Sequence, residues 1–110
     1  MNRKWVLMIA MLFAACFLSP RTFAATATGE DVYKGKCASC HGGDGSGQTT
    51  MGKIFKLRDF GSADVQKQSD EELTRITSKG KGKMPSFEGK LKTDQIGAVV
   101  GYIRTLGKGK

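Results

Sequence analysis

The chain has 110 residues and a formal net charge of +8 at pH 7, and 39% of its residues are hydrophobic. A chain of this length is expected to form one small domain. If the N-terminal leader described below is removed, the 86 remaining residues suffice for one small domain. Only 26 of those residues are apolar, about 30%, which is low for a globular domain. Because such a core is thin, we expect the domain to need a further source of stability.

The first predicted element is a secretory leader over residues 1–24. Arg3 and Lys4 precede an apolar run of 14 residues from Trp5 to Leu18, and small residues follow this run. A helix that spans a membrane needs roughly 18 or more apolar residues, so this run is too short for a comfortable span. We therefore expect a cleaved leader and no stable insertion into a membrane.

The end of the leader sets the composition of the mature chain. Cleavage is predicted after Ala24, with cleavage after Ala27 as the alternative. A lipoprotein signal has an aliphatic residue three positions before its cysteine, but Phe13 occupies that position relative to Cys16. Cys16 is therefore interpreted as part of the removed leader. Two cysteines then remain, and no structural disulfide is expected.

The leader also removes three of the 18 basic residues, which leaves 15 against 10 acidic residues, a net +5. Export and this modest charge argue against nucleic-acid binding.

The first helix of the mature chain leads into a motif of two thiols and an imidazole. Thr28 followed by Asp31 predicts the helix start, and the helix continues into Cys37-Ala38-Ser39-Cys40-His41. Two cysteines three positions apart lie on neighbouring edges of one helical turn, so both sulfurs can reach the two vinyl groups along one side of a porphyrin. The histidine can then bind the iron through Nε2. The motif predicts one haem c, attached through Cys37 and Cys40, with His41 as an axial ligand.

Two other chemistries use similar residues. A Cys-x-x-Cys pair is also a redox dithiol, but a thioredoxin-like protein needs a βαβ context and a longer chain. A structural zinc site needs four ligands, and His41 is the single histidine in the chain. Haem attachment is therefore the preferred interpretation, and a dithiol oxidoreductase without haem stays as an alternative.

After the motif, the chain is predicted to alternate between glycine-rich loops and helices, without internal repeats or the two-residue periodicity of strands. Ser69 and Glu72 match a capping box, and Gly80 is expected to end the helix that this box begins. Leu73 and Ile76 are expected to face inward from it. The predicted elements are, in order, a loop over 42–52, a short helix over 62–68, a helix over 69–80 and a lysine-rich loop over 79–83.

The last helix has the clearest pattern. Thr93 is the predicted N-cap and Gly107 the predicted end. Gly97 and Gly101 lie inside this helix, where each costs about 1 kcal/mol relative to alanine. They suggest that another backbone approaches closely there, with simple tolerance as the alternative. The apolar residues at helical spacing are Ile96, Val99, Val100, Ile103 and Leu106.

The second axial position decides between electron transfer and the binding of external ligands. The mature chain offers two methionines and no second histidine. Met84 lies in a glycine-rich loop before Pro85, which favours an extended backbone, and it is 43 residues from His41, enough for the chain to pass around a porphyrin. Met51 is ten residues from His41 and is expected to pack on the haem edge. We therefore expect His41 and Met84 to bind the iron.

These features resemble the class I c-type cytochromes over essentially the whole mature chain. Gly29 and Tyr33 lie eight and four positions before Cys37, where the family has a glycine and an aromatic residue at the crossing of the first and last helices. Val99 and Tyr102 resemble the partner face of this crossing. The stretches over 37–47 and 82–87 resemble the family's haem-binding segment and distal-ligand loop.

One position departs from the family pattern. In many members, a proline soon after the motif presents its carbonyl to the proximal histidine, but Pro85 is the only proline of the mature chain. We expect another carbonyl in the loop over 42–52 to accept the hydrogen bond from the His41 Nδ1–H.

The resemblance implies an all-α fold for residues 25–110, with about three to five helices wrapped around one covalent haem. It also implies a periplasmic one-electron carrier, expected to be a monomer and not an enzyme. Redox proteins with acidic docking surfaces, such as a membrane oxidase or reductase complex, are the expected partners. Lys79, Lys81 and Lys83 precede Met84, and Lys53 and Lys56 are expected to extend this basic collar. The alternative is a haem-based sensor or peroxidase-like protein in which an external ligand displaces Met84.

Overall fold

The computed structural model describes residues 28–108, and within them the fold is helical. The predicted leader, its cleavage sites and Cys16 lie outside these residues. No β-strand occurs in the described part, only two isolated bridges in the segment between the last two helices. The helices are α2 (Gly29–Lys36), α3 (Ala38–His41), α4 (Thr50–Phe55), α5 (Ala63–Gln66), α6 (Asp70–Lys79) and α7 (Thr93–Leu106).

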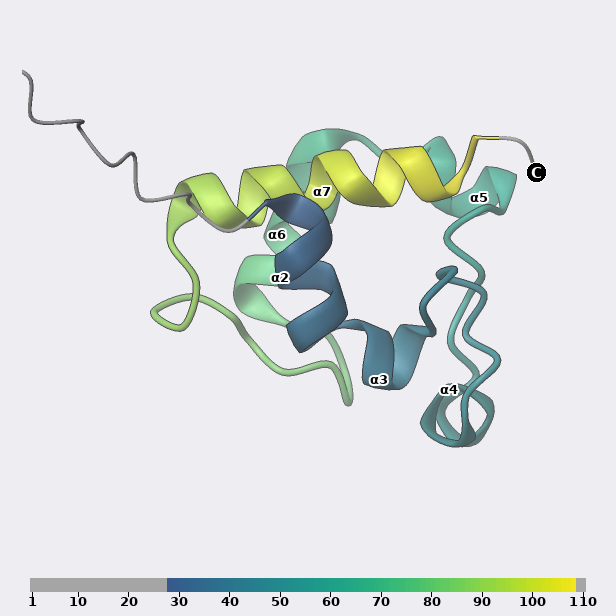
Figure 1. The fold of residues 1–110 in the computed structure, drawn as a ribbon. Helices are drawn as coiled ribbons and strands as arrows, with labels where there is room; N and C mark the ends of the chain where they lie inside the picture. Colours follow the sequence, from purple (N-terminus) through teal and green to yellow (C-terminus); the bar gives the residue numbers. More distant parts are fainter. Residues whose placement is uncertain (1–27, 109–110) are drawn as a thin grey trace, which may run out of the picture.

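The all-α prediction is confirmed, although these six helices exceed the expected three to five. The motif forms its own short helix after Cys37, and α4 forms within and beyond the predicted loop over 42–52. Thr49 caps α4, since its side chain accepts a hydrogen bond from the Gly52 N–H. In Figure 1, α7 runs along the top of the molecule, and α2, α3 and α4 lie below it.

The crossing of α2 over α7 organises the core. A Cβ atom on Gly29 would lie 2.1 Å from the Ala98 carbonyl oxygen, so only glycine permits this approach of the two backbones. Tyr33 is fully buried one turn later, and the centroids of its ring and of the Tyr102 ring are 5.1 Å apart. The crossing that the family resemblance implies is therefore confirmed. The suggestion that Gly97 makes such an approach is wrong.

Gly101 behaves in the same way as Gly97, because neither has an atom within 4 Å of the position where a Cβ would stand. Replacing Gly29 by alanine is expected to destabilise the folded protein by about 1–3 kcal/mol or more, since two backbones must move apart. Gly101→Ala is the matched control and is expected to stabilise it by up to about 1 kcal/mol, because alanine favours the helix. Chemical denaturation measures both changes. Equal effects of the two variants would contradict this account of the crossing.

The remaining helices begin close to the predicted residues. Thr28 and Asp31 form a capping box at the predicted start of α2, and Ser69 caps α6 by accepting from the Glu72 N–H. The Glu72 carboxylate pairs with Arg75 and does not return to Ser69, so only half of that capping box forms. The Thr93 prediction is wrong by one residue: the N-cap of α7 is Lys92.

The packing of α6 and α7 follows their apolar patterns. Four of the five predicted stripe residues of α7 are buried, and Leu106 is half-buried. From α6, Leu73 is buried as predicted, whereas Ile76 is half-buried and Thr77 takes the other inward position. The Thr77 hydroxyl donates to the Leu73 carbonyl, which satisfies this buried polar group. The buried hydrophobic residues are Val32, Tyr33, Val65, Leu73, Phe87, Ile96, Val99, Val100 and Ile103.

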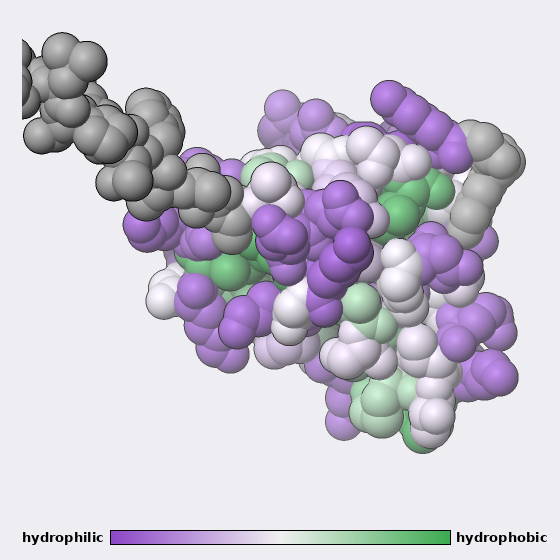
Figure 2. Space-filling model, viewed as in Figure 1, coloured by the Kyte–Doolittle hydropathy of each residue, from purple (hydrophilic) through white to green (hydrophobic). Residues whose placement is uncertain are grey.

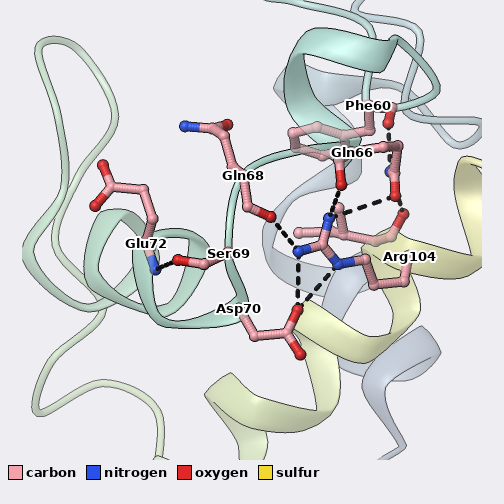
Figure 3. Close-up of polar contacts among 8 residues, drawn as sticks. Phe60, Gln66, Gln68, Ser69, Asp70, Glu72 and Arg104 are labelled. Atoms are coloured by element: carbon pink, nitrogen blue, oxygen red, sulfur yellow. Dashed lines mark hydrogen bonds and ion pairs between the residues drawn. The ribbon is translucent and has the colours of Figure 1, made fainter.

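Arg104 ties the end of α7 to the connection between α5 and α6 (Figure 3). Its guanidinium donates to the carbonyl oxygens of Gln66 and Gln68 and to the Asp70 carboxylate. The Arg104 side chain is 25% exposed, so these hydrogen bonds are partly shielded from water. The Gln66 carboxamide in turn donates to the carbonyl oxygens of Phe60 and Ile103, at 2.5 and 3.2 Å. The end of α7 is thus joined to the segment over 60–70, which lies 34 to 38 residues earlier in the chain at the contacts of Arg104.

Candidate haem-binding site

Cys37, Cys40 and His41 lie within a single turn of helix. Cys37 ends α2, where its N–H donates to the Tyr33 carbonyl over 2.9 Å, and it also caps α3. The N–H groups of Cys40 and His41 both donate to the Cys37 carbonyl, at 3.2 and 3.0 Å. The structure therefore brings the three predicted motif residues together on one rigid element.

Both thiols of the motif are free and half-buried. Burial, with a smaller contribution from Cys40, raises the pKa of Cys37 to about 11. A redox dithiol has a lowered pKa on its attacking cysteine, so this environment does not favour a thioredoxin-like reaction. Among residues 28–108, no three His, Cys, Asp or Glu side chains converge as a metal site would need.

The imidazole of His41 stacks on the ring of Phe60. The ring centroids are 4.4 Å apart, and the planes differ by 20°. The Nδ1 atom of His41 is buried and has no hydrogen-bond partner in the described part of the chain. Burial also lowers the pKa of His41, which favours the neutral imidazole that can bind a metal.

The expectation that a loop carbonyl accepts from Nδ1 of His41 is not met. Two carbonyls of that loop are already engaged: the Gly42 oxygen accepts from the Tyr33 hydroxyl at 2.6 Å, and the Gly45 oxygen accepts from the Phe60 N–H at 2.8 Å. Burial raises the pKa of Tyr33, so its hydroxyl stays protonated and keeps donating.

The loop after the motif is bound back onto the motif. The Gly47 N–H donates to the His41 carbonyl over 2.8 Å, and the Thr49 hydroxyl donates to the Cys40 carbonyl over 2.5 Å. These bonds satisfy carbonyls at the end of α3 that have no partner within the helix. They also fix the position of the motif relative to α4.

Met84 lies in a tight turn after α6. The N–H and carbonyl groups of Lys81 and Met84 bond to each other, at 3.0 and 3.2 Å, around Gly82 and Lys83. Gly82 has a φ of 58°, and Lys83 has no positive φ, as in a type II′ turn with glycine at its first central position. Met84 is half-buried. The structure thus holds Met84 on a separate segment from the motif.

The Met84 segment is anchored on the end of α6. The N–H groups of Phe87 and Glu88 donate to the carbonyls of Thr77 and Ser78, at 3.1 and 3.0 Å. Gly80 has a φ of 75°, and a Cβ there would lie 2.6 Å from the Met84 carbonyl oxygen. Glycine at position 80 is therefore required for this segment to fold back.

The lysines near Met84 differ in their surroundings. Lys79 pairs with Glu88 over 2.6 Å, which neutralises part of the predicted basic collar. Lys81 and Lys83 are exposed in the turn, and Lys53 and Lys56 are exposed on and beside α4.

The second methionine, Met51, lies on α4 within an apolar patch. Met51, Ile54 and Phe55 are 39%, 63% and 36% exposed, and Figure 2 shows apolar surface at the lower edge of the molecule, over α4. The sequence predicted a loop at Met51, and the patch was not expected.

Comparison with known sequences finds one matching family and several similar proteins. The family described as cytochrome C oxidase, cbb3-type, subunit III matches residues 24–103. A cytochrome c6 from Nostoc sp. (strain PCC 7120) is 36% identical over 94% of this chain and 88% of its own length. A cytochrome c6 from Leptolyngbya boryana is 35% identical over 73% of this chain and 91% of its own. The cbb3-type cytochrome c oxidase subunit FixP of Bradyrhizobium diazoefficiens is 34% identical over 76% of this chain, which corresponds to 28% of FixP.

A solved structure is also similar. The c-type cytochrome KustC0563 aligns with a TM-score of 0.69 and 32% sequence identity, covering 74% of this chain and 99% of that protein. None of the helices described over residues 28–108 has the length and the apolar composition of a membrane span.

Proposed function

This chain belongs to the class I c-type cytochromes, and from that premise we propose that it is an exported one-electron carrier with His41 and Met84 as the axial ligands of its haem. Membership of the family makes it a haem c protein of electron transfer. Cys37 and Cys40 are the proposed attachment points. We propose that residues 1–24 are a cleaved leader, that residues 25–110 form the periplasmic domain, and that this domain is a monomer and not an enzyme.

The residues of the motif suit a covalently bound haem. Two free, half-buried thiols lie on one helical turn, and the imidazole that follows has a buried, unpartnered Nδ1. The proposal rests on this single turn, because it supplies two thiols for attachment and one neutral nitrogen ligand from one helical segment.

The haem supplies one-electron redox chemistry between the ferric and ferrous states when it is bound. The protein's part would be to hold His41 and Met84, the proposed iron ligands, in place. α3 fixes His41 through backbone hydrogen bonds, and the tight turn before Pro85 fixes Met84. A thioether ligand favours the ferrous state, and burial of the ring by apolar side chains has the same effect.

The proposed partners are redox proteins with acidic docking surfaces, such as a membrane oxidase or reductase complex. Lys81 and Lys83 flank the turn that carries Met84, so they would steer an acidic partner towards this side of the site. The Lys79–Glu88 pair reduces the contribution of Lys79.

Electron transfer to an acidic redox protein is expected to slow as ionic strength rises, since salt screens this attraction. Lys81→Gln combined with Lys83→Gln is expected to lower the second-order rate constant at low salt by roughly 2- to 10-fold. Lys67→Gln, which removes an exposed lysine beside α5, is the control. Stopped-flow kinetics over a range of salt concentrations measures these rates. A flat salt dependence would remove the steering proposal.

Mass spectrometry of the protein produced with haem-attachment machinery tests the proposed function. The expected product has lost its leader and carries one haem on the peptide with Cys37 and Cys40, and its visible spectrum is that of low-spin iron. A product with no haem would favour a dithiol protein, and high-spin iron would favour a sensor or peroxidase-like protein.

A further inference from the structure

We propose that Phe60 is a positioning residue that sets the plane of the His41 imidazole by stacking, in place of a hydrogen bond to Nδ1. The inference rests on the proposed function, because it takes His41 as the haem ligand. Phe60 lies 19 positions after His41, outside the segments that resemble the family's haem-binding and distal-ligand sequences.

The contact between the two rings is close and nearly parallel. With centroids 4.4 Å apart and planes 20° from parallel, the Phe60 face lies against the face of the imidazole. A second ring neighbour of Phe60 is Tyr33, whose ring meets it edge-on with centroids 6.3 Å apart and planes at 65°. Since Tyr33 is fully buried in the α2–α7 crossing, Phe60 is backed by the core.

The backbone of Phe60 is fixed on both sides. Its N–H donates to the Gly45 carbonyl over 2.8 Å, and its carbonyl accepts from the Gln66 carboxamide over 2.5 Å. The Gln66 side chain is held by the Ile103 carbonyl, and Arg104 binds the Gln66 backbone (Figure 3). The end of α7 thus holds Phe60, and Phe60 lies against His41.

This arrangement has a chemical consequence for the ligand. A hydrogen bond from Nδ1–H to a carbonyl fixes the orientation of a histidine ligand and raises its basicity. A stacked phenyl ring fixes the orientation without raising the basicity. An imidazole held in this way would donate less electron density to a bound iron, which would favour the ferrous state. Loss of the Phe60 ring frees the imidazole to rotate and lets Nδ1–H find an acceptor.

The test compares four variants of the holoprotein with the wild type by equilibrium redox titration and by electron paramagnetic resonance of the ferric state. Phe60→Leu removes the flat ring and keeps an apolar side chain, while Phe60→Tyr keeps the ring. Tyr102→Leu is the control, because its ring contacts Tyr33 and makes no ring contact with His41. Gln66→Leu removes the anchor of Phe60 without altering either ring, and it serves if Phe60→Leu yields no holoprotein.

Phe60→Leu is expected to lower the reduction potential and to broaden or shift the resonance signal, since the imidazole plane is no longer fixed. Gln66→Leu is expected to do the same to a smaller extent, and Phe60→Tyr to match the wild type. Tyr102→Leu is expected to lower the melting temperature alone. Wild-type signal and potential in both Phe60→Leu and Gln66→Leu, or an equal change in Tyr102→Leu, would overturn the proposal. A wild type without low-spin, histidine-ligated iron would instead overturn the proposed function.

Discussion

Replacing Cys37 and Cys40 together by alanine is expected to abolish covalent haem attachment and to leave a chain without a cooperative unfolding transition. Residues 25–110 are about 30% apolar, and only nine hydrophobic residues are buried among residues 28–108. A bound porphyrin would add a large flat apolar surface to this thin core. Circular dichroism during heating measures the transition.

The matched control for this variant is Ser39→Ala. Ser39 lies in the same turn, is exposed and has no thiol, so its replacement is expected to leave both haem content and melting behaviour unchanged. A haem-free double variant that melts cooperatively with native helicity would show that the protein core is sufficient without the cofactor.

Replacing Met84 by alanine is expected to open one axial position of the iron. The ferric protein should lose its methionine–iron charge-transfer band and bind added ligands such as azide or cyanide. Its reduction potential should fall, because the choice of axial ligands sets haem potentials over a range of roughly 0.8 V. Absorption spectroscopy and redox titration measure these changes.

Met51→Leu is the control for this variant, because Met51 is exposed on α4 and is not the expected ligand. It is expected to keep the charge-transfer band and the potential of the wild type. Loss of the band in Met51→Leu with retention in Met84→Ala would exchange the proposed roles of the two methionines.

The helix starts could be predicted where a side chain bonds to the backbone a few residues away. Thr28, Ser62 and Ser69 each accept from the third following N–H, and all three mark a predicted helix start. The start of α7 was misplaced because the Gln95 side chain caps the Lys92 N–H, and a lysine is not a usual N-cap.

The features that the sequence did not predict depend on tertiary contacts. Gly97 and Gly101 resemble packing glycines in the helical pattern, yet neither is approached closely; Gly29, which only the family resemblance placed at the crossing, makes the contact with Ala98. Phe60 reaches His41 only once the chain has turned back after α4. Arg104 binds groups 34 to 38 residues away, a separation at which no local pattern applies.

The same distinction applies to the candidate site. The motif is predictable because its chemistry is contained in five consecutive residues. The orientation of its imidazole is not predictable in this way, because the stacked ring comes from another segment and no described residue bonds to Nδ1.

The central claim is a closed haem centre with His41 and Met84 as axial ligands, and the absorption spectrum of the ferric wild-type protein tests it most directly. The account predicts a low-spin haem spectrum with a near-infrared methionine–iron charge-transfer band that Met84→Ala removes. A high-spin spectrum without that band in the wild type would contradict it.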